Sequence, residues 1–367
     1  MTNHNALNER LKRSYLVYLK EAKRHDGSTL DGVAKAIHRF ETYTKFRDFR
    51  SFRIEQAVGF KHHMAGLANL RTGKPLSKAT LNQTLNALRN FFRWLAGRPG
   101  FRSRLNYHDA DYFNLSEKET RIATAHRQGP VPTLDQIHFT LSAMPSGTDT
   151  EKRNRALLAF TILTGARDGA TASLKLRHID ITDGKVFQDA RDVNTKFSKT
   201  FSTWFFPVGG EAFQILAEWV HFLHAEKLWG VDDPVFPATK VINGINQTFV
   251  AAGLDRRHWT NAGPIRAVFK AAFNAAGLPS FNPHSFRKTL VRLGQEVCKT
   301  PEEFKAWSQN LGHEEVLTTF RNYGNIDAGR QASIIKSLGR QSSDSVPRSE
   351  LPKLIEDFLT QHKLNVN

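Results

Sequence analysis

Residues 307–323, WSQNLGHEEVLTTFRNY, join a Leu-Gly-His turn at Leu311, Gly312 and His313 to one tyrosine, Tyr323, ten residues after the histidine. Gly312 favours a helix break, because glycine tolerates backbone conformations that other residues avoid. Thr318 suits the cap of a short helix or turn that presents Tyr323. A single tyrosine after a Gly-His pair is usually a packed or surface aromatic. The stretch therefore gains meaning only beside two others upstream.

Both upstream stretches carry an arginine close to a helix end. Residues 161–181, TILTGARDGATASLKLRHIDI, indicate the end of an apolar helix, a break at Gly165 and then Arg167. Residues 281–294, FNPHSFRKTLVRLG, place Pro283 in the first turn of another helix. His284 and Arg287 are three residues apart, which puts them on one face of that helix. The chain thus offers an arginine, a His-x-x-Arg pair, a Leu-Gly-His turn and a tyrosine, in that order.

This order resembles the tyrosine recombinase (phage integrase) family of site-specific DNA recombinases, from about residue 10 to about residue 340. The resemblance implies that Tyr323 is the nucleophile and forms a 3′-phosphotyrosine link. It assigns the companion catalytic positions to Arg167, His284, Arg287 and His313. Each position also has an ordinary structural interpretation, as an ion-pair partner, a helix-terminal histidine, a core histidine or a packed aromatic.

The family's catalytic lysine lies between its second and third strands, in the stretch NTKFSKTFS here. Lys196 is our first choice, because the family's lysine often follows a threonine and precedes a second basic residue. Lys199 is the alternative. Tyrosine suits cleavage because its phosphodiester link to DNA keeps the bond energy for rejoining. Arginine suits a phosphate because guanidinium is always charged and binds two oxygens, and lysine can act as the proton donor. We expect no metal and no cofactor.

Three departures from the family pattern stand out. Ala170 occupies a position that is often acidic, and Asp168 is expected to face differently on its helix. Lys288 replaces a frequent histidine after Arg287. The step from His313 to the tyrosine is ten residues, one longer than the commoner nine.

Composition points to a polyanionic partner. The 367 residues carry a net charge of +17, and residues 1–100 hold 19 Lys and Arg against 7 Asp and Glu. The only cysteine, Cys298, excludes an internal disulfide and fits a reducing cytoplasm. No signal peptide, membrane span or zinc-like cluster is visible.

Apolar periodicity predicts four helices in the first hundred residues, at 9–24, 29–43, 54–67 and 77–96. The last has its apolar residues on one face. Its other face is expected to turn outward and contact DNA through Lys78, Asn82, Asn86, Arg89 and Arg93. An ordinary solvated face is the alternative for these five side chains.

The remaining chain is expected to be mostly helical around a small antiparallel sheet, with strands near 178–182, 185–189 and 201–208. The fold class is therefore mainly α. The expected domains are a DNA core-binding domain over 1–100, a linker over 101–130, a catalytic domain over 131–340 and a tail with an amphipathic helix over 341–367.

The leading function is a site-specific recombinase or integrase of double-stranded DNA, working as a homotetramer, with room for an accessory directionality protein. The tail either docks on a neighbouring subunit or packs on its own domain. A type IB topoisomerase-like enzyme that relaxes DNA is one alternative. A non-catalytic sequence-specific DNA-binding protein of the same fold is another.

Overall fold

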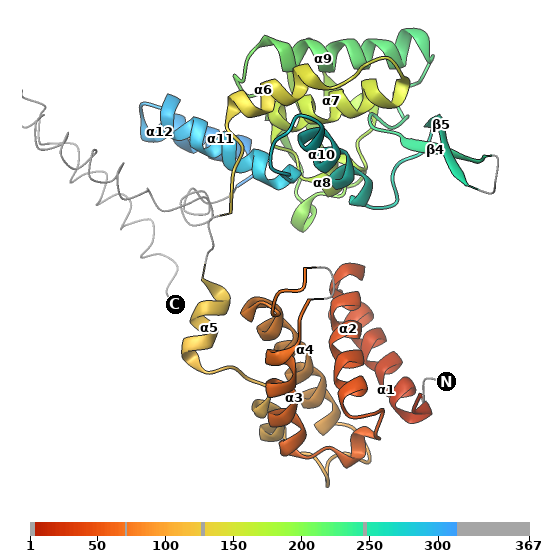
Figure 1. The fold of residues 1–367 in the computed structure, drawn as a ribbon, viewed down its shortest axis with the longest axis vertical. Coiled ribbons are helices and arrows are strands. Elements are labelled where there is room, and N and C mark those ends of the chain that lie inside the picture. The colour runs from red at the N-terminus through yellow and green to blue at the C-terminus, as the bar shows by residue number, and fades with distance from the viewer. Residues whose placement is uncertain (1–3, 70–71, 126–128, 245–247, 314–367) are drawn as a thin grey trace, which may run out of the picture. The chain divides into compact units, whose positions relative to one another are not determined.

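The computed structural model describes residues 4–69, 72–125, 129–244 and 248–313. The chain divides into two compact units, residues 1–127 and residues 128–367 (Figure 1). Within the described ranges, no helix is both long and apolar enough to cross a membrane.

The first unit is helical, and the four expected helices are present. Its helices are α1 (Ala6–Val17, continued by a π-helical turn, Tyr18–Ala22), α2 (Gly27–Tyr43), α3 (Ile54–Gly66), α4 (Lys78–Ala96) and α5 (Glu117–Thr124), with 3-10 turns at Phe49–Ser51 and Tyr107–Tyr112. Asp26 caps α2, because its Oδ1 accepts the backbone N–H of Thr29 at 2.7 Å.

The core of the first unit is aromatic and includes part of the expected linker. The Phe40 ring lies edge-on to Phe60, Phe92 and Phe113, with centroids 5.3, 5.4 and 5.3 Å away. Phe113 falls within residues 101–130, as does the buried Leu105. This segment therefore packs into the first unit up to Phe113. Its apolar residues lack helical spacing and stand between loop signals, so their burial depends on tertiary packing.

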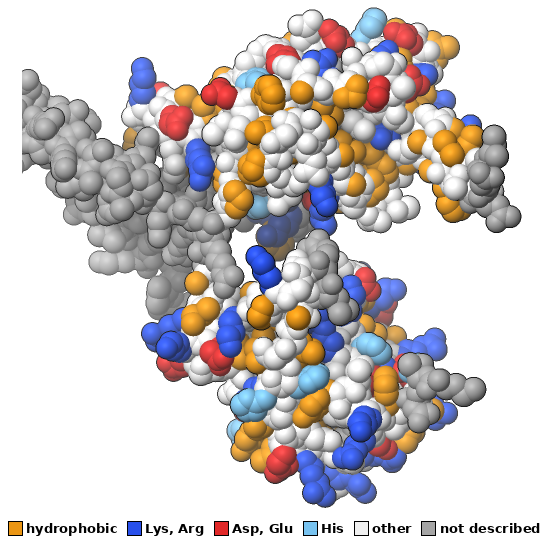
Figure 2. Space-filling view, in the orientation of Figure 1, with side chains coloured by type: hydrophobic (Ala, Val, Ile, Leu, Met, Phe, Trp, Pro, Cys, Tyr) orange, Lys and Arg blue, Asp and Glu red, His pale blue; other side chains and the backbone are white. Residues whose placement is uncertain are grey.

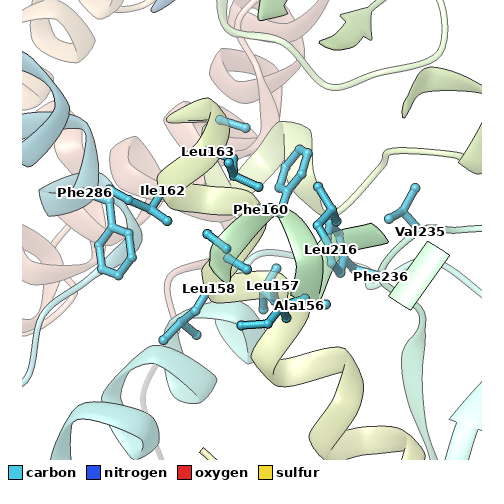
Figure 3. Packing of buried hydrophobic residues seen from close by; sticks show 14 of the residues in the cluster. Ala156, Leu157, Leu158, Phe160, Ile162, Leu163, Leu216, Val235, Phe236 and Phe286 are labelled. Carbon is cyan, nitrogen blue, oxygen red and sulfur yellow. The ribbon is translucent and has the colours of Figure 1, made fainter. Parts of the chain in front are cut away.

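The second unit is built around α7, which is buried on almost every side. Its helices are α6 (Leu134–Ala143), α7 (Asp149–Thr164), α8 (Asp168–Thr171), α9 (Gly210–His221, continued by a π-helical turn, Phe222–Glu226), α10 (Gly263–Ala275), α11 (Pro283–Val297) and α12 (Pro301–Asn310). Figure 3 shows Leu157, Phe160 and Leu163 of α7 among residues of other elements, including Leu216 and Phe286. A buried central helix thus ends next to Gly165.

The described part of this unit also holds two antiparallel sheets. β1 (Ile179–Asp180), β2 (Lys185–Gln188) and β3 (Phe201–Trp204) form one sheet in sequence order, with Val186 paired to Ile179 and Thr203. These strands and the surrounding helices confirm the expected mainly α fold with a small antiparallel sheet. Sequence reasoning missed a second hairpin of β4 (Ala238–Asn243) and β5 (Phe249–Asp255), where we expected mostly helix. Its strands expose much of their apolar surface, as at Phe249, so they lack the alternation that predicts a strand.

Candidate active site

Gly165 ends α7 and starts the site. Its φ of 60° is left-handed, and its N–H donates to the Thr161 carbonyl at 2.8 Å. A Cβ on Gly165 would lie 2.8 Å from Leu311 Cδ2 and 3.0 Å from Leu290 Cδ1. Glycine therefore lets the Leu-Gly-His turn and α11 approach the end of α7. Arg167 follows as the N-cap residue of the short helix α8 and is half-buried.

The start of α11 holds His284 and Arg287. Asn282 caps this helix, with its Oδ1 accepting the N–H of Ser285 at 3.1 Å, and Pro283 occupies the first turn. Arg287 lies one turn further in and is only 2% exposed. His284 is the more exposed of the pair.

Arg287 links three segments that are far apart in the sequence. Its Nη1 donates to the Gly165 carbonyl, and its Nη2 donates to the Leu311 carbonyl at 2.6 Å. The same Nη2 lies 3.0 Å from His313 Nε2. Among the described residues, its buried Nε has no hydrogen bond and no carboxylate forms an ion pair with it. A buried cation without a carboxylate is expensive to keep, so this arrangement favours an anionic ligand.

His313 lies beside this cation and is 6% exposed. Its pKa is lowered to about 3, first by burial and then by the positive charges of Arg287 and Arg167, with smaller effects from His284 and Lys199. The imidazole is therefore neutral at neutral pH. Of these four groups, Arg287 contacts His313 directly.

His284 responds to the same surroundings. Partial burial lowers its pKa first, followed by the charges of Arg287, Lys288 and Arg167, whereas Asp168 acts in the opposite direction. Lys288 is thus one of the positive charges around the site, as its place after Arg287 suggested.

A pocket of about 340 Å³ opens beside these groups. It is lined by Arg167, Asp168, Arg266, Asn282, Pro283, His284 and Arg287. Two of these were not expected there. Arg266 comes from α10 and matches no motif, and Asp168 was expected to face elsewhere. The pocket brings three arginines to one place with a single aspartate, which suits a phosphate.

The two candidate lysines differ in their surroundings. Both lie in the turn between β2 and β3, where Phe197 and Ser198 have φ values of 62° and 51°. Lys196 is exposed, with its Nζ 4.7 Å from the ring centroid of Phe197. Lys199 is half-buried, and its charge contributes to the lowered pKa of His313. These observations favour Lys199, the second choice from sequence.

The Leu-Gly-His turn packs on the strand that follows these lysines. Gly312 has a φ of 71°, and a Cβ there would lie 2.7 Å from the Phe201 ring. The backbone N–H of Trp204 also donates to Asn310 Oδ1 at 2.7 Å. Tyr323 and the tail over 341–367 lie outside the described residues.

The polar face of α4 is less open than expected. Lys78 pairs with Glu119 of α5 at 2.6 Å, and Arg93 pairs with Asp111 at 2.5 Å. Asn86 Nδ2 donates to Asn82 Oδ1 at 3.4 Å, and Arg89 Nε is buried without a hydrogen bond among the described residues. The face was expected to turn outward. It is partly covered because residues 107–124, expected as linker, fold back along α4.

Known proteins share sequence and fold with this chain. No family model matches the chain. The tyrosine recombinase XerC of Halalkalibacterium halodurans is 20% identical over 322 residues, which cover 85% of this chain and 91% of the relative. XerC of Lactobacillus delbrueckii subsp. bulgaricus is 23% identical over 256 residues, covering 68% and 73%.

Solved structures share the fold. A lambda integrase (75–356) dimer bound to a COC′ core site superposes with a TM-score of 0.59 at 16% identity, covering 87% of this chain and 96% of that one. The Tn1549 transposon integrase in complex with transposon right end DNA superposes with a TM-score of 0.57 at 14% identity. The match covers 90% of this chain and 99% of that one. Fold and site thus define an α-rich protein with a cationic pocket. The chain is similar over most of its length to tyrosine recombinases, and it shares its fold with solved integrase structures.

Proposed function

We propose that this protein is a site-specific DNA recombinase or integrase that cuts and rejoins DNA through a 3′-phosphotyrosine intermediate on Tyr323. One observation carries the proposal. Arg167, His284 and Arg287 line one pocket and His313 contacts Arg287, although these residues come from three segments far apart in the sequence. Core packing alone does not require two arginines and two histidines at one place.

The arginines would hold the scissile phosphate. Arg287 is fixed by the carbonyls of Gly165 and Leu311, so its guanidinium is oriented before DNA arrives. Preorganised donors stabilise charge that develops in the transition state, typically by a few kcal/mol for each donor. The buried Nε of Arg287 is the donor without a partner among the described residues. Arg167, half-buried at the pocket wall, would hold a second oxygen.

The histidines and a lysine would handle protons and hydrogen bonds. Neutral His313 accepts from Arg287 through Nε2, which leaves its Nδ1 as the protonated nitrogen. A bound phosphate would bring negative charge beside both histidines and raise their pKa values towards the ordinary range. Lys199, half-buried near His313, is the better supported donor for the leaving 5′-oxygen, and Lys196 is the alternative.

Binding to double-stranded DNA would draw on the basic first unit. Figure 2 shows Lys and Arg side chains spread over the visible face of this unit. Asn82, Asn86 and Arg89 stay candidates for DNA contact, and Lys78 and Arg93 would first have to leave Glu119 and Asp111. Affinity should fall steeply with salt because phosphate contacts release counterions.

Assembly on DNA is also part of the proposal. The structural relatives include a lambda integrase tetramer bound to a Holliday junction. By analogy, this chain would act as a homotetramer, with its tail over 341–367 docking either on a neighbour or on its own unit. An accessory directionality protein would act on the same assembly.

The test uses a nicked duplex made from the DNA that flanks the gene, since many such enzymes act beside their own gene. Full-length protein should form a covalent adduct that survives denaturant, whereas Tyr323→Phe should bind without forming one. Retarded DNA without any adduct would favour the non-catalytic DNA-binding alternative. An adduct with relaxation of any supercoiled plasmid, and no exchange between two sites, would favour the topoisomerase alternative.

A further inference from the structure

We propose that Arg266 is a DNA-phosphate ligand of this pocket, a third guanidinium beside Arg167 and Arg287 that Asp168 holds in place. The inference rests on the proposed function and deepens it. It adds a residue from α10, which contributes nothing to the sequence motifs of the site.

Arg266 reaches the pocket through a defined contact. Its Nε donates to Asp168 Oδ2 at 2.6 Å, across 98 residues of sequence. The other carboxylate oxygen, Oδ1, accepts the N–H of Gly169 at 3.0 Å. Asp168 directly follows Arg167 and starts α8. Both oxygens of the Asp168 carboxylate are therefore engaged. This carboxylate holds Arg266 next to Arg167.

This ion pair differs from other arginine–aspartate pairs of the same unit. Arg256 donates through Nε and Nη2 to the two oxygens of Asp233, and Arg257 donates through Nε and Nη2 to Asp255. Arg266 donates through Nε alone. Among the described residues neither of its Nη atoms has a hydrogen bond, which leaves four of its five N–H groups for a ligand.

The charge balance of the pocket favours an anion over simple neutralisation of Asp168. Three arginines line the pocket with one aspartate, so the lining carries excess positive charge even with both histidines neutral. Arg266 is 62% exposed, which leaves it accessible to a large ligand such as a duplex. A DNA strand presents phosphates in series, so a third guanidinium at the pocket has a ligand at the cut or next to it.

The experiment measures binding of full-length protein to a duplex that the wild-type protein selects from a random-sequence pool. Fluorescence anisotropy is recorded over a range of salt for wild type, Arg266→Ala and the matched control Arg256→Ala. Arg266→Ala should bind roughly tenfold more weakly or worse, and its slope of log K against log salt should fall by about 0.9. Arg256→Ala should match wild type.

A scan with single neutral methylphosphonates then identifies the contact. A methylphosphonate at one position should weaken DNA binding by wild type and by Arg256→Ala. It should not weaken binding by Arg266→Ala, because that variant has already lost the contact. Arg266→Lys, which keeps the charge but not the planar fork, should fall between them. A general loss of structure would not produce insensitivity at a single phosphate.

This inference is overturned, and the proposed function stands, if Arg266→Ala keeps the full wild-type pattern of methylphosphonate interference while Arg287→Ala does not. Arg287→Ala would then bind DNA more weakly and lose sensitivity to the methylphosphonate at one position. If Arg287→Ala also keeps the full pattern, the pocket does not bind phosphate and the proposed function fails with it.

Discussion

Arg287 Nη2 lies 3.0 Å from Nε2 of His313 in a buried contact. Arginine has only donors, so this nitrogen of His313 must be the acceptor and the proton of the neutral ring must sit on Nδ1. The contact thus fixes the tautomer of His313 and holds the cation that has no carboxylate partner among the described residues.

Stability should fall as the pH is lowered, because His313 resists protonation in the folded chain. Its pKa is about 3 in the folded chain and about 6.5 in the unfolded chain. Between these values the unfolded state binds the proton, so the contribution of His313 is complete above pH 6.5 and is lost towards pH 3. The free energy of unfolding, measured in urea at pH 7 and pH 5, should fall with decreasing pH in wild type. This slope against pH should be smaller in His313→Gln, by up to about 1.4 kcal/mol per pH unit. The same change at exposed His221 is the control, and equal slopes in wild type and His313→Gln would contradict the prediction.

Arg287→Lys should separate charge from geometry. Lysine keeps the positive charge but cannot reach the Gly165 and Leu311 carbonyls and His313 together. The free energy of unfolding should drop by about 3 kcal/mol, and adduct formation should be lost. Arg167→Lys, at a half-buried position, should lose adduct formation with a much smaller change in chemical denaturation. Equal stability losses in the two variants would show that Arg287 has no special structural role.

Gly165→Ala should destabilise the second unit, although Gly165 does not line the pocket. The left-handed φ of 60° and the 2.8 Å approach to Leu311 Cδ2 leave no space for a methyl group. We expect a loss of about 2 kcal/mol or more in the unfolding of the second unit. Gly210→Ala is the control, because nothing lies within 4 Å of a Cβ there. A Gly165→Ala variant as stable as Gly210→Ala would mean that α7 and the Leu-Gly-His turn are not in close contact.

The lysines can be distinguished by the leaving group. Lys199→Ala should slow cleavage by roughly a hundredfold or more, as expected for loss of a general acid, and Lys196→Ala should have little effect. A duplex with sulfur in place of the leaving 5′-oxygen needs no proton donor, because a thiolate leaves readily. That duplex should restore the cleavage rate of Lys199→Ala. Rescue of Lys196→Ala instead would return the role to Lys196.

The sequence was most informative where a pattern is local. The apolar face at Leu81, Leu85 and Leu88 predicted α4, and the strands expected near 178–182 and 185–189 are present as β1 and β2. The four motif residues that lie within the described part of the chain all surround one site, because each follows a helix end that its own glycine, proline or cap defines.

What the sequence did not predict depends on long-range packing. Nothing local distinguishes Arg266 from other arginines, since its role depends on α10 lying beside Asp168, 98 residues away. The burial of Leu105 and Phe113 likewise needs the surface of α4 to exist first. The preference for Lys199 over Lys196 depends on which of the two is half-buried in a turn that contains the left-handed residues Phe197 and Ser198.

The central claim is the identity of the nucleophile. The most direct measurement is mass spectrometry of the protease-digested covalent adduct, formed by the full-length protein on the nicked duplex from the gene flank. We expect one modified peptide, in which a nucleotide is joined through its 3′-phosphate to the phenolic oxygen of Tyr323. A nucleotide on any other residue, or an adduct of unchanged yield from Tyr323→Phe, would contradict the account.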